Sequence, residues 1–214
     1  MRLELAERLR CPGAHAPTPL IVVAQETVER DLRRAIVGCA VCGLEARIAS
    51  GTLTFPDGRV VAGAGRGAPE VDTAALERLV ALLHLDAPGG AVLLAGGYAR
   101  FAVALEAACE VHAVVLASAH EDVHHGAHQE RHHDAPWIPF TDATFRAAAV
   151  AGLPSALLGD LARVVTPGGR IVAEAGVEPP AGTRLLARDD REWVAESAGG
   201  GGGMVELRRT RAEG

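Results

Sequence analysis

The sequence predicts an α/β protein in which a small β-rich, metal-binding unit precedes a doubly wound sheet. A Cys-x-x-Cys pair lies among short strand-like runs near the N-terminus. From residue 72 onward, short apolar runs alternate with amphipathic ones, as strands and helices do in a doubly wound sheet. A Gly/Ala-rich stretch separates the two patterns. We therefore expect a first domain over residues 1–60, a linker over 61–71 and a second domain over 72–214.

Composition sets the broad class of the protein. Of the 214 residues 49% are hydrophobic and only 3% aromatic, so the core must consist of small and branched side chains. A net charge of −6 gives no general attraction to nucleic acid. No apolar run approaches the roughly 20 residues that cross a bilayer, and the first residues lack the apolar core of a signal peptide. We expect a cytoplasmic protein without a membrane span and with reduced thiols.

The first unit carries the ligands of a metal site. Cys39 and Cys42 have the spacing at which two thiolates converge on one ion, and Gly43 follows where a tight turn is needed. Upstream, Cys11 and His15 offer a third thiolate and an imidazole. These four residues predict a tetrahedral zinc site that holds together a segment with few large apolar side chains. The alternative is that the metal has been lost and only a small β unit persists.

The expected elements follow in order along the chain. Strand-like runs in the first unit cover residues 19–24, 35–37, 46–49 and 51–55. In the second unit, Asp72 and Thr73 can cap a helix whose apolar positions are Leu76, Leu79, Val80 and Leu83. Helical patterns also cover residues 99–108 and 156–164, and strand-like runs cover 91–95, 111–117, 145–150 and 170–175. Residues 192–196 and 204–208, joined by glycines, predict a final hairpin. Cys109 ends an apolar helical run and is expected in the core.

Part of the first unit resembles a known family. The run 36–43, together with Ile48, Gly51 and Phe55, resembles the zinc-ribbon activator subunit of tRNA and protein methyltransferases, a ribbon also found fused in front of methyltransferase domains. The resemblance covers about residues 9–55. It departs where the family has a second cysteine near Ala14, so His15 would take that place.

The second unit resembles the class I S-adenosylmethionine (SAM) methyltransferases, which have a Rossmann-like doubly wound domain. The resemblance rests on three segments in order: residues 92–97, 134–140 and 162–172. It implies a SAM site in which Gly96 and Gly97 permit close backbone approach and Asp134 and Ala135 contact the adenine. It assigns no catalytic residue.

Three departures from that family concern its cofactor. Leu94 and Leu116 stand where the family has acidic residues, and Arg100 stands where it has a third small residue. Loss of the ribose carboxylate at position 116 alone would weaken SAM binding by about one to two orders of magnitude. We therefore expect a methyltransferase-like protein with a degenerate SAM site, working as a non-catalytic binding or scaffold subunit. The alternative is an active SAM-dependent methyltransferase with an unusual cofactor pocket.

Two further features concern partners and metals. Residues 20–23 are all apolar, more than one face of a small ribbon can bury, so we expect a protein partner or a homo-oligomer at an exposed strand edge. Residues 120–133 contain six of the nine histidines. This stretch is interpreted as a solvated loop. The alternatives are a second metal site, as in a metal-handling protein, or catalytic histidines.

Overall fold

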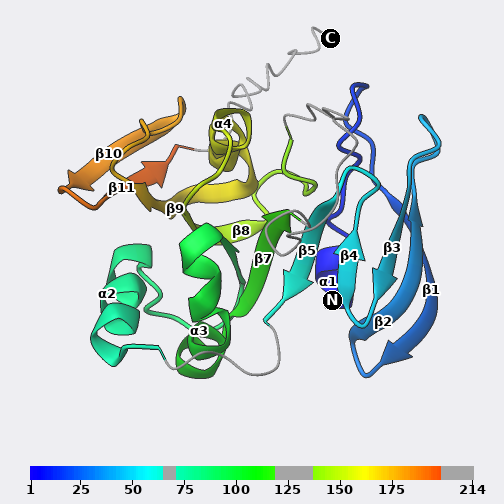
Figure 1. The fold of residues 1–214 in the computed structure, drawn as a ribbon, viewed down its shortest axis with the longest axis horizontal. Helices are drawn as coiled ribbons and strands as arrows, with labels where there is room; N and C mark the ends of the chain where they lie inside the picture. Colours follow the sequence, from blue (N-terminus) through cyan, green and yellow to red (C-terminus); the bar gives the residue numbers. More distant parts are fainter. Residues whose placement is uncertain (65–70, 119–136, 199–214) are drawn as a thin grey trace, which may run out of the picture.

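Eleven strands form one continuous mixed sheet in the computed structural model, which describes residues 1–64, 71–118 and 137–198. The strands follow the order β1-β2-β3-β4-β5-β7-β6-β8-β9-β11-β10 across the sheet (Figure 1). Parallel pairing is limited to the four central strands: β7 with β6, β6 with β8, and β8 with β9. All other neighbouring strands pair antiparallel. The expected Rossmann-like doubly wound sheet is therefore wrong. The antiparallel strands of the first unit extend the same sheet instead of forming a separate one.

The strand and helix bounds are as follows. The strands are β1 (Ile21–Val28), β2 (Asp31–Gly38), β3 (Glu45–Ala49), β4 (Thr52–Thr54), β5 (Arg59–Gly63), β6 (Ala91–Ala95), β7 (His112–Ser118), β8 (Phe145–Val150), β9 (Val165–Glu174), β10 (Thr183–Arg188) and β11 (Glu192–Ser197). The described helices are α1 (Leu3–Ala6), α2 (Thr73–Leu83), α3 (Ala102–Cys109) and α4 (Ser155–Val164), with a 3-10 turn η1 (Gly96–Phe101) before α3.

An antiparallel meander, β1 to β5, forms the N-terminal half of the sheet. Alternation explains β3, where Ala46 and Ile48 are buried between exposed Glu45 and Arg47. β5 was not expected as a strand. Its signal is the Pro56-Asp57-Gly58 turn before it, since these residue types favour a tight turn between two strands.

The two halves join where β5 pairs antiparallel with β7. Residues 61–63, expected to begin the linker, form part of β5, and Val61 lies opposite Leu116. Residues 65–70 of that expected linker lie outside the described residues. The sheet therefore runs unbroken across the expected boundary, and the division into two domains stays a prediction.

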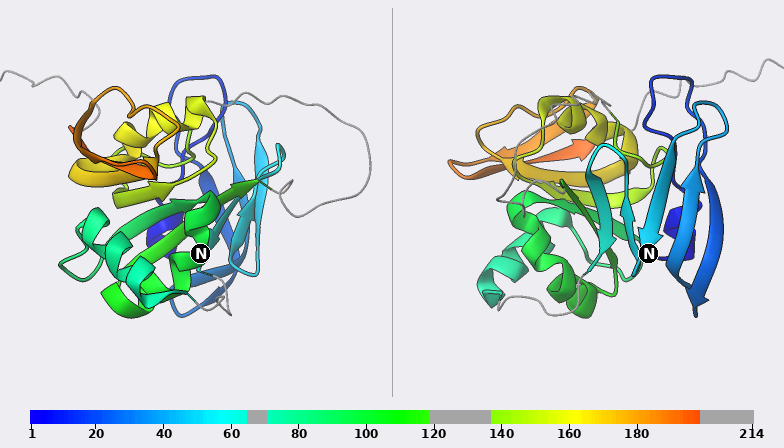
Figure 2. Two further views of the ribbon diagram at one scale, coloured as in Figure 1. Left: turned by 60° about the vertical axis from the view of Figure 1, so that its left-hand side comes forward. Right: turned by 45° about the vertical axis from the view of Figure 1, so that its right-hand side comes forward.

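Helices cover both faces of the parallel strands (Figure 2). Alternate side chains of β6 point to opposite faces: Val92 and Leu94 pack with α2 and α3, whereas Leu93 packs with α4 and the N-terminal half. β6 is buried along its whole length, as its apolar run predicts. Cys109, expected in the core, is half-buried and packs against the cluster beneath α2 and α3.

β11 forms its hairpin with β10, which was not expected as a strand. Its other side pairs with β9, so the expected hairpin between residues 192–196 and 204–208 is wrong. Residues 204–208 themselves lie outside the described residues. Among the helices of the described part, none is long and apolar enough to cross a membrane.

Candidate metal centre

Cys39 and Cys42 lie in the turn between β2 and β3. The turn is closed by two backbone hydrogen bonds: Cys39 N donates to Leu44 O at 2.9 Å, and Gly43 N donates to Cys39 O at 3.1 Å. Gly43 has a φ of +68°, which glycine adopts without strain. The local sequence therefore folds the two thiols toward one point, as the spacing predicted.

Cys11 and His15 lie in the loop that connects α1 to β1. Cys11 N donates to Thr18 O at 2.8 Å, which holds the two ends of the loop together. Gly13 N lies 3.3 Å from the Cys11 Sγ and donates to it. A Cβ on Gly13 would lie 3.1 Å from the His15 ring and 3.3 Å from the Cys11 Sγ, so the loop closes tightly around these two ligands.

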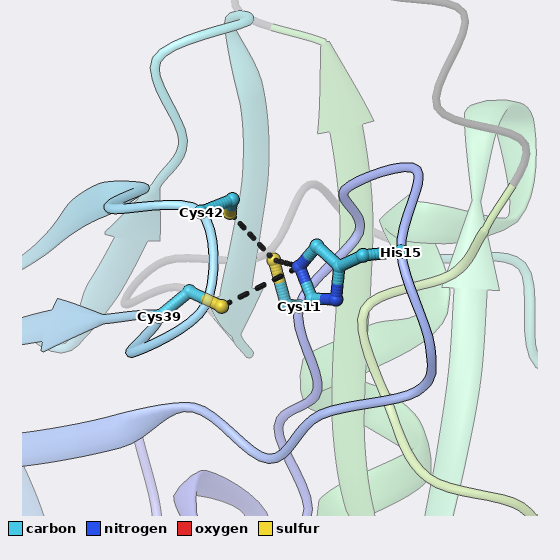
Figure 3. Close-up of side chains that lie close together, drawn as sticks. All are labelled: Cys11, His15, Cys39 and Cys42. Atoms are coloured by element: carbon cyan, nitrogen blue, oxygen red, sulfur yellow. Dashed lines mark hydrogen bonds between the residues drawn. The ribbon is translucent and has the colours of Figure 1, made fainter.

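The four side chains converge in the way that a four-coordinate ion requires (Figure 3). All four ligand atoms lie within 4.8 Å of one another. The Cys11 and Cys42 sulfurs are 3.6 Å apart, and the His15 Nε2 lies 3.2 Å from the Cys11 Sγ and 3.5 Å from the Cys39 Sγ. A tetrahedral ion with metal–sulfur bonds of about 2.3 Å and metal–nitrogen bonds of about 2.0 Å separates its ligands by roughly 3.5 to 3.8 Å. The cluster could therefore hold a metal ion.

The His15 ring is oriented by its other nitrogen. Nδ1 lies 2.7 Å from Ala16 O and 3.4 Å from the Thr18 hydroxyl oxygen. Donation from Nδ1–H to Ala16 O leaves the lone pair on Nε2, which faces the sulfurs. Thr18 was not anticipated from the sequence, although its position three residues after His15 is the available signal.

The two buried thiols have different acidities. Burial raises the pKa of Cys11 above the ordinary thiol value. Burial also works to raise the pKa of Cys39, but the backbone N–H groups of Cys42 and Val41, with the neighbouring thiols, lower it below the ordinary value. The knuckle therefore stabilises a thiolate at Cys39, and a thiolate is the form of cysteine that ligates metals.

The loop that carries Cys11 is attached to the C-terminal half of the chain. Arg10 N donates to Pro139 O at 3.2 Å, and Leu9 forms an antiparallel bridge with Phe140. Thr141 N donates to Arg8 O at 2.8 Å. Residues 8–10, which precede Cys11, thus pair with the segment around Phe140. The position of Cys11 therefore depends on both halves of the molecule.

The residues expected to bind SAM are only partly described. Asp134 and Ala135 lie outside the described residues, as do residues 120–133 with their histidines. Gly96 has a φ of +57°, and a Cβ there would lie 2.1 Å from Ala151 O. This position therefore requires glycine, because the backbone of Ala151, just after β8, lies where a side chain would begin. Gly97 has no atom within 4 Å of the place its Cβ would take, so its surroundings are open.

No protein-family model matches the chain, and no curated protein matches it significantly in sequence. The two resemblances drawn from the sequence therefore remain predictions.

Proposed function

We propose that this chain is a zinc-stabilised binding protein: a methyltransferase-like scaffold with a degenerate SAM site that works as a non-catalytic subunit of a complex. The observation that carries the zinc-stabilised part of the proposal is the convergence of Cys11, His15, Cys39 and Cys42 within 4.8 Å. Three thiols and one imidazole form a donor set that suits zinc, and four protein ligands leave no open position for substrate. The ion would be structural, fixing the loop of Cys11 against the β2–β3 turn.

The surroundings of Leu94 and Leu116 support a degenerate SAM site. The side chain of Leu94 is fully buried, and Leu116 is 5% exposed. Leu116 lies between Val61 of β5 and Ala95 of β6 in the sheet. Both positions contribute apolar packing where an enzyme of the resembled family would place a carboxylate. The alternative of an active methyltransferase requires ribose recognition from some other group.

The outer edge of the sheet supports a partner. β1 is the outermost strand, and Ile21 and Val23 are each 56% exposed, while Val28 is 48% exposed. An edge strand with exposed apolar side chains readily accepts another strand. At the other side of the meander, β5 is paired with β7 of the same chain. Within the meander, the edge open to a partner strand is therefore β1; the other outer strand of the sheet is β10, where Leu185 is 47% exposed.

Elemental analysis of the purified protein tests the metal. We expect about one zinc per chain, lost from Cys39→Ser and retained in Cys109→Ser, because Cys109 lies outside the cluster. Removing zinc with a chelator should also lower the melting temperature of the wild type and of Cys109→Ser. Zinc that is absent from the wild type, or unchanged in Cys39→Ser, contradicts the assignment.

Calorimetry with SAM tests the degenerate cofactor site, for which we expect a dissociation constant well above the micromolar range. Light scattering and affinity capture test the role in a complex, and they should show a specific assembly. Tight SAM binding would restore the enzyme alternative. A strictly monomeric, zinc-loaded protein that reproducibly captures nothing would refute the role in a complex.

A further inference from the structure

A cavity of about 300 Å³ lies between α2, η1 and the turn that joins β10 to β11. This volume is at the lower end of the range for small-molecule sites. One part of its wall is apolar, formed by Ala75, Leu79, Leu82 and Phe101. The rest is strongly polar, with three arginines and one glutamate. The metal centre shares none of these residues.

The acidic groups at this cavity are already paired. The Glu192 carboxylate accepts from the Tyr98 hydroxyl at 2.6 Å and from the Arg78 Nε at 2.7 Å. Asp189, beside the cavity, accepts from Arg78 and from the backbone N–H groups of Arg191 and Glu192. Those backbone donors, together with Arg78, lower the pKa of Asp189 to about 2. Asp189 is therefore ionised, and Arg78 is shared between the two carboxylates, each of which also has a further hydrogen-bond donor.

Two guanidinium groups remain at the cavity. Arg100 lies over the Phe101 ring with its guanidinium carbon 4.8 Å from the ring centre, which holds it against the apolar wall. The side chains of Arg100 and Arg191 form no hydrogen bond or ion pair with a described residue. The cavity thus combines an apolar wall with two cationic groups that pair with no acidic group of the described residues.

We propose that this cavity binds a small organic anion, with a compact apolar body on Leu79, Leu82 and Phe101 and a carboxylate, sulfonate or phosphate group between Arg100 and Arg191. Guanidinium groups bind such oxyanions through short, charge-assisted hydrogen bonds. The Tyr98–Glu192–Arg78 network keeps the wall rigid and prevents Glu192 from competing for the two arginines. The site is independent of the zinc assignment and does not require a role in a complex.

The fluorescent sulfonate 8-anilinonaphthalene-1-sulfonate, titrated into the full-length, zinc-loaded protein, is a suitable probe because it combines an apolar body with one anionic group. We expect saturable binding at one site. The double variant Arg100→Ala/Arg191→Ala should raise the dissociation constant at least tenfold, since each arginine supplies a charge-assisted bond. Inorganic phosphate should compete with the probe in the wild type and not in the double variant.

A matched pair of variants separates this cavity from other apolar surfaces, including the exposed β1 strand. Ala75→Phe fills the cavity without changing its charge and should abolish binding at this site. Ala74→Phe adds the same side chain at an exposed position of α2 outside the cavity lining and should leave binding unchanged. Binding that is not saturable, or that survives both Ala75→Phe and the arginine double variant, overturns the proposal. Should Ala75→Phe fail to fold, the exposed arginines still provide the test.

Discussion

Removing the carboxylate of Asp160 should destabilise the protein strongly, because this group holds the segment around Ile138 and Phe140, to which residues 8–10 of the N-terminal half attach. Asp160 lies on α4 with its side chain 5% exposed. It accepts from Ile138 N at 2.7 Å and from the Arg163 Nε at 2.6 Å. Arg163 in turn donates to the carbonyl oxygens of Ile138 and Phe140 at 3.0 and 2.7 Å. Burial works to lower the pKa of Arg163, but Asp160 and Asp142 outweigh it and raise the pKa.

The size of the effect follows from what each substitution leaves behind. Breaking a buried ion pair by removing one partner costs about 3–5 kcal/mol. Asp160→Ala should fall near the lower limit, about 3 kcal/mol, because Arg163 keeps Asp142 at 2.9 Å and two carbonyl acceptors. At about 2–4 °C per kcal/mol for a chain of this size, the melting temperature should fall by roughly 6–12 °C. Arg163→Ala should cost more, because it leaves the buried Asp160 carboxylate with the Ile138 N–H as its one remaining donor among the described residues.

Urea unfolding at neutral pH with a fixed excess of zinc measures these free energies, since bound metal also contributes to stability. The double variant should lose less than the sum of the single variants, with a coupling of about 2 kcal/mol. Arg184→Ala, which breaks the exposed pair with Glu196, is the control and should cost under about 1 kcal/mol. A cost for Asp160→Ala below about 1 kcal/mol, or strictly additive variants, would refute this explanation of the junction.

Three further outcomes are expected. Gly96→Ala should destabilise the protein by about 1–3 kcal/mol in urea unfolding, because the new Cβ would meet Ala151 O. Gly97→Ala, where the surroundings are open, should be nearly neutral. Equal effects of the two substitutions would contradict the packing role of Gly96. Val23→Lys on β1 should weaken self-association or partner capture in light-scattering and pull-down assays. Leu185→Lys on the opposite edge strand, β10, should leave both unchanged. The reverse pattern would show that the partner binds at β10 and not at β1. The folded-state pKa of Asp189 is depressed, so its ionised form stabilises the fold above the unfolded pKa of about 3.9, and this contribution is lost as pH falls toward 2. The stability difference between wild type and Asp189→Asn should therefore be constant above about pH 5, shrink as pH falls through the folded pKa of about 2, and vanish only near pH 1. A difference that is as large at pH 1 as at neutral pH would show that the carboxylate charge is not its cause.

The metal centre is the part of the site that the sequence predicted best. The Cys39-x-x-Cys42 spacing is local, so the short turn by itself brings the two thiols together. Cys11 and His15 could be added because they are the only other cysteine and histidine in the first sixty residues. The short apolar run 91–95 likewise predicted a buried strand, since its composition suits only a position covered on both faces.

The sequence by itself determined the four candidate metal ligands, several strands and the apolar character of Leu94 and Leu116. Only the tertiary structure decided that the two halves share one sheet, because the pairing of β5 with β7 joins residues about fifty positions apart through backbone groups that every residue carries. The same reason explains why β10, and not a later segment, became the partner of β11. The tertiary structure also decided the role of Gly96. The Gly96-Gly97 pair suggests room for a cofactor, whereas the fold places Ala151 O against Gly96. The chemistry of each side chain can be read from the local sequence, but which strands pair with one another depends on how the whole molecule packs.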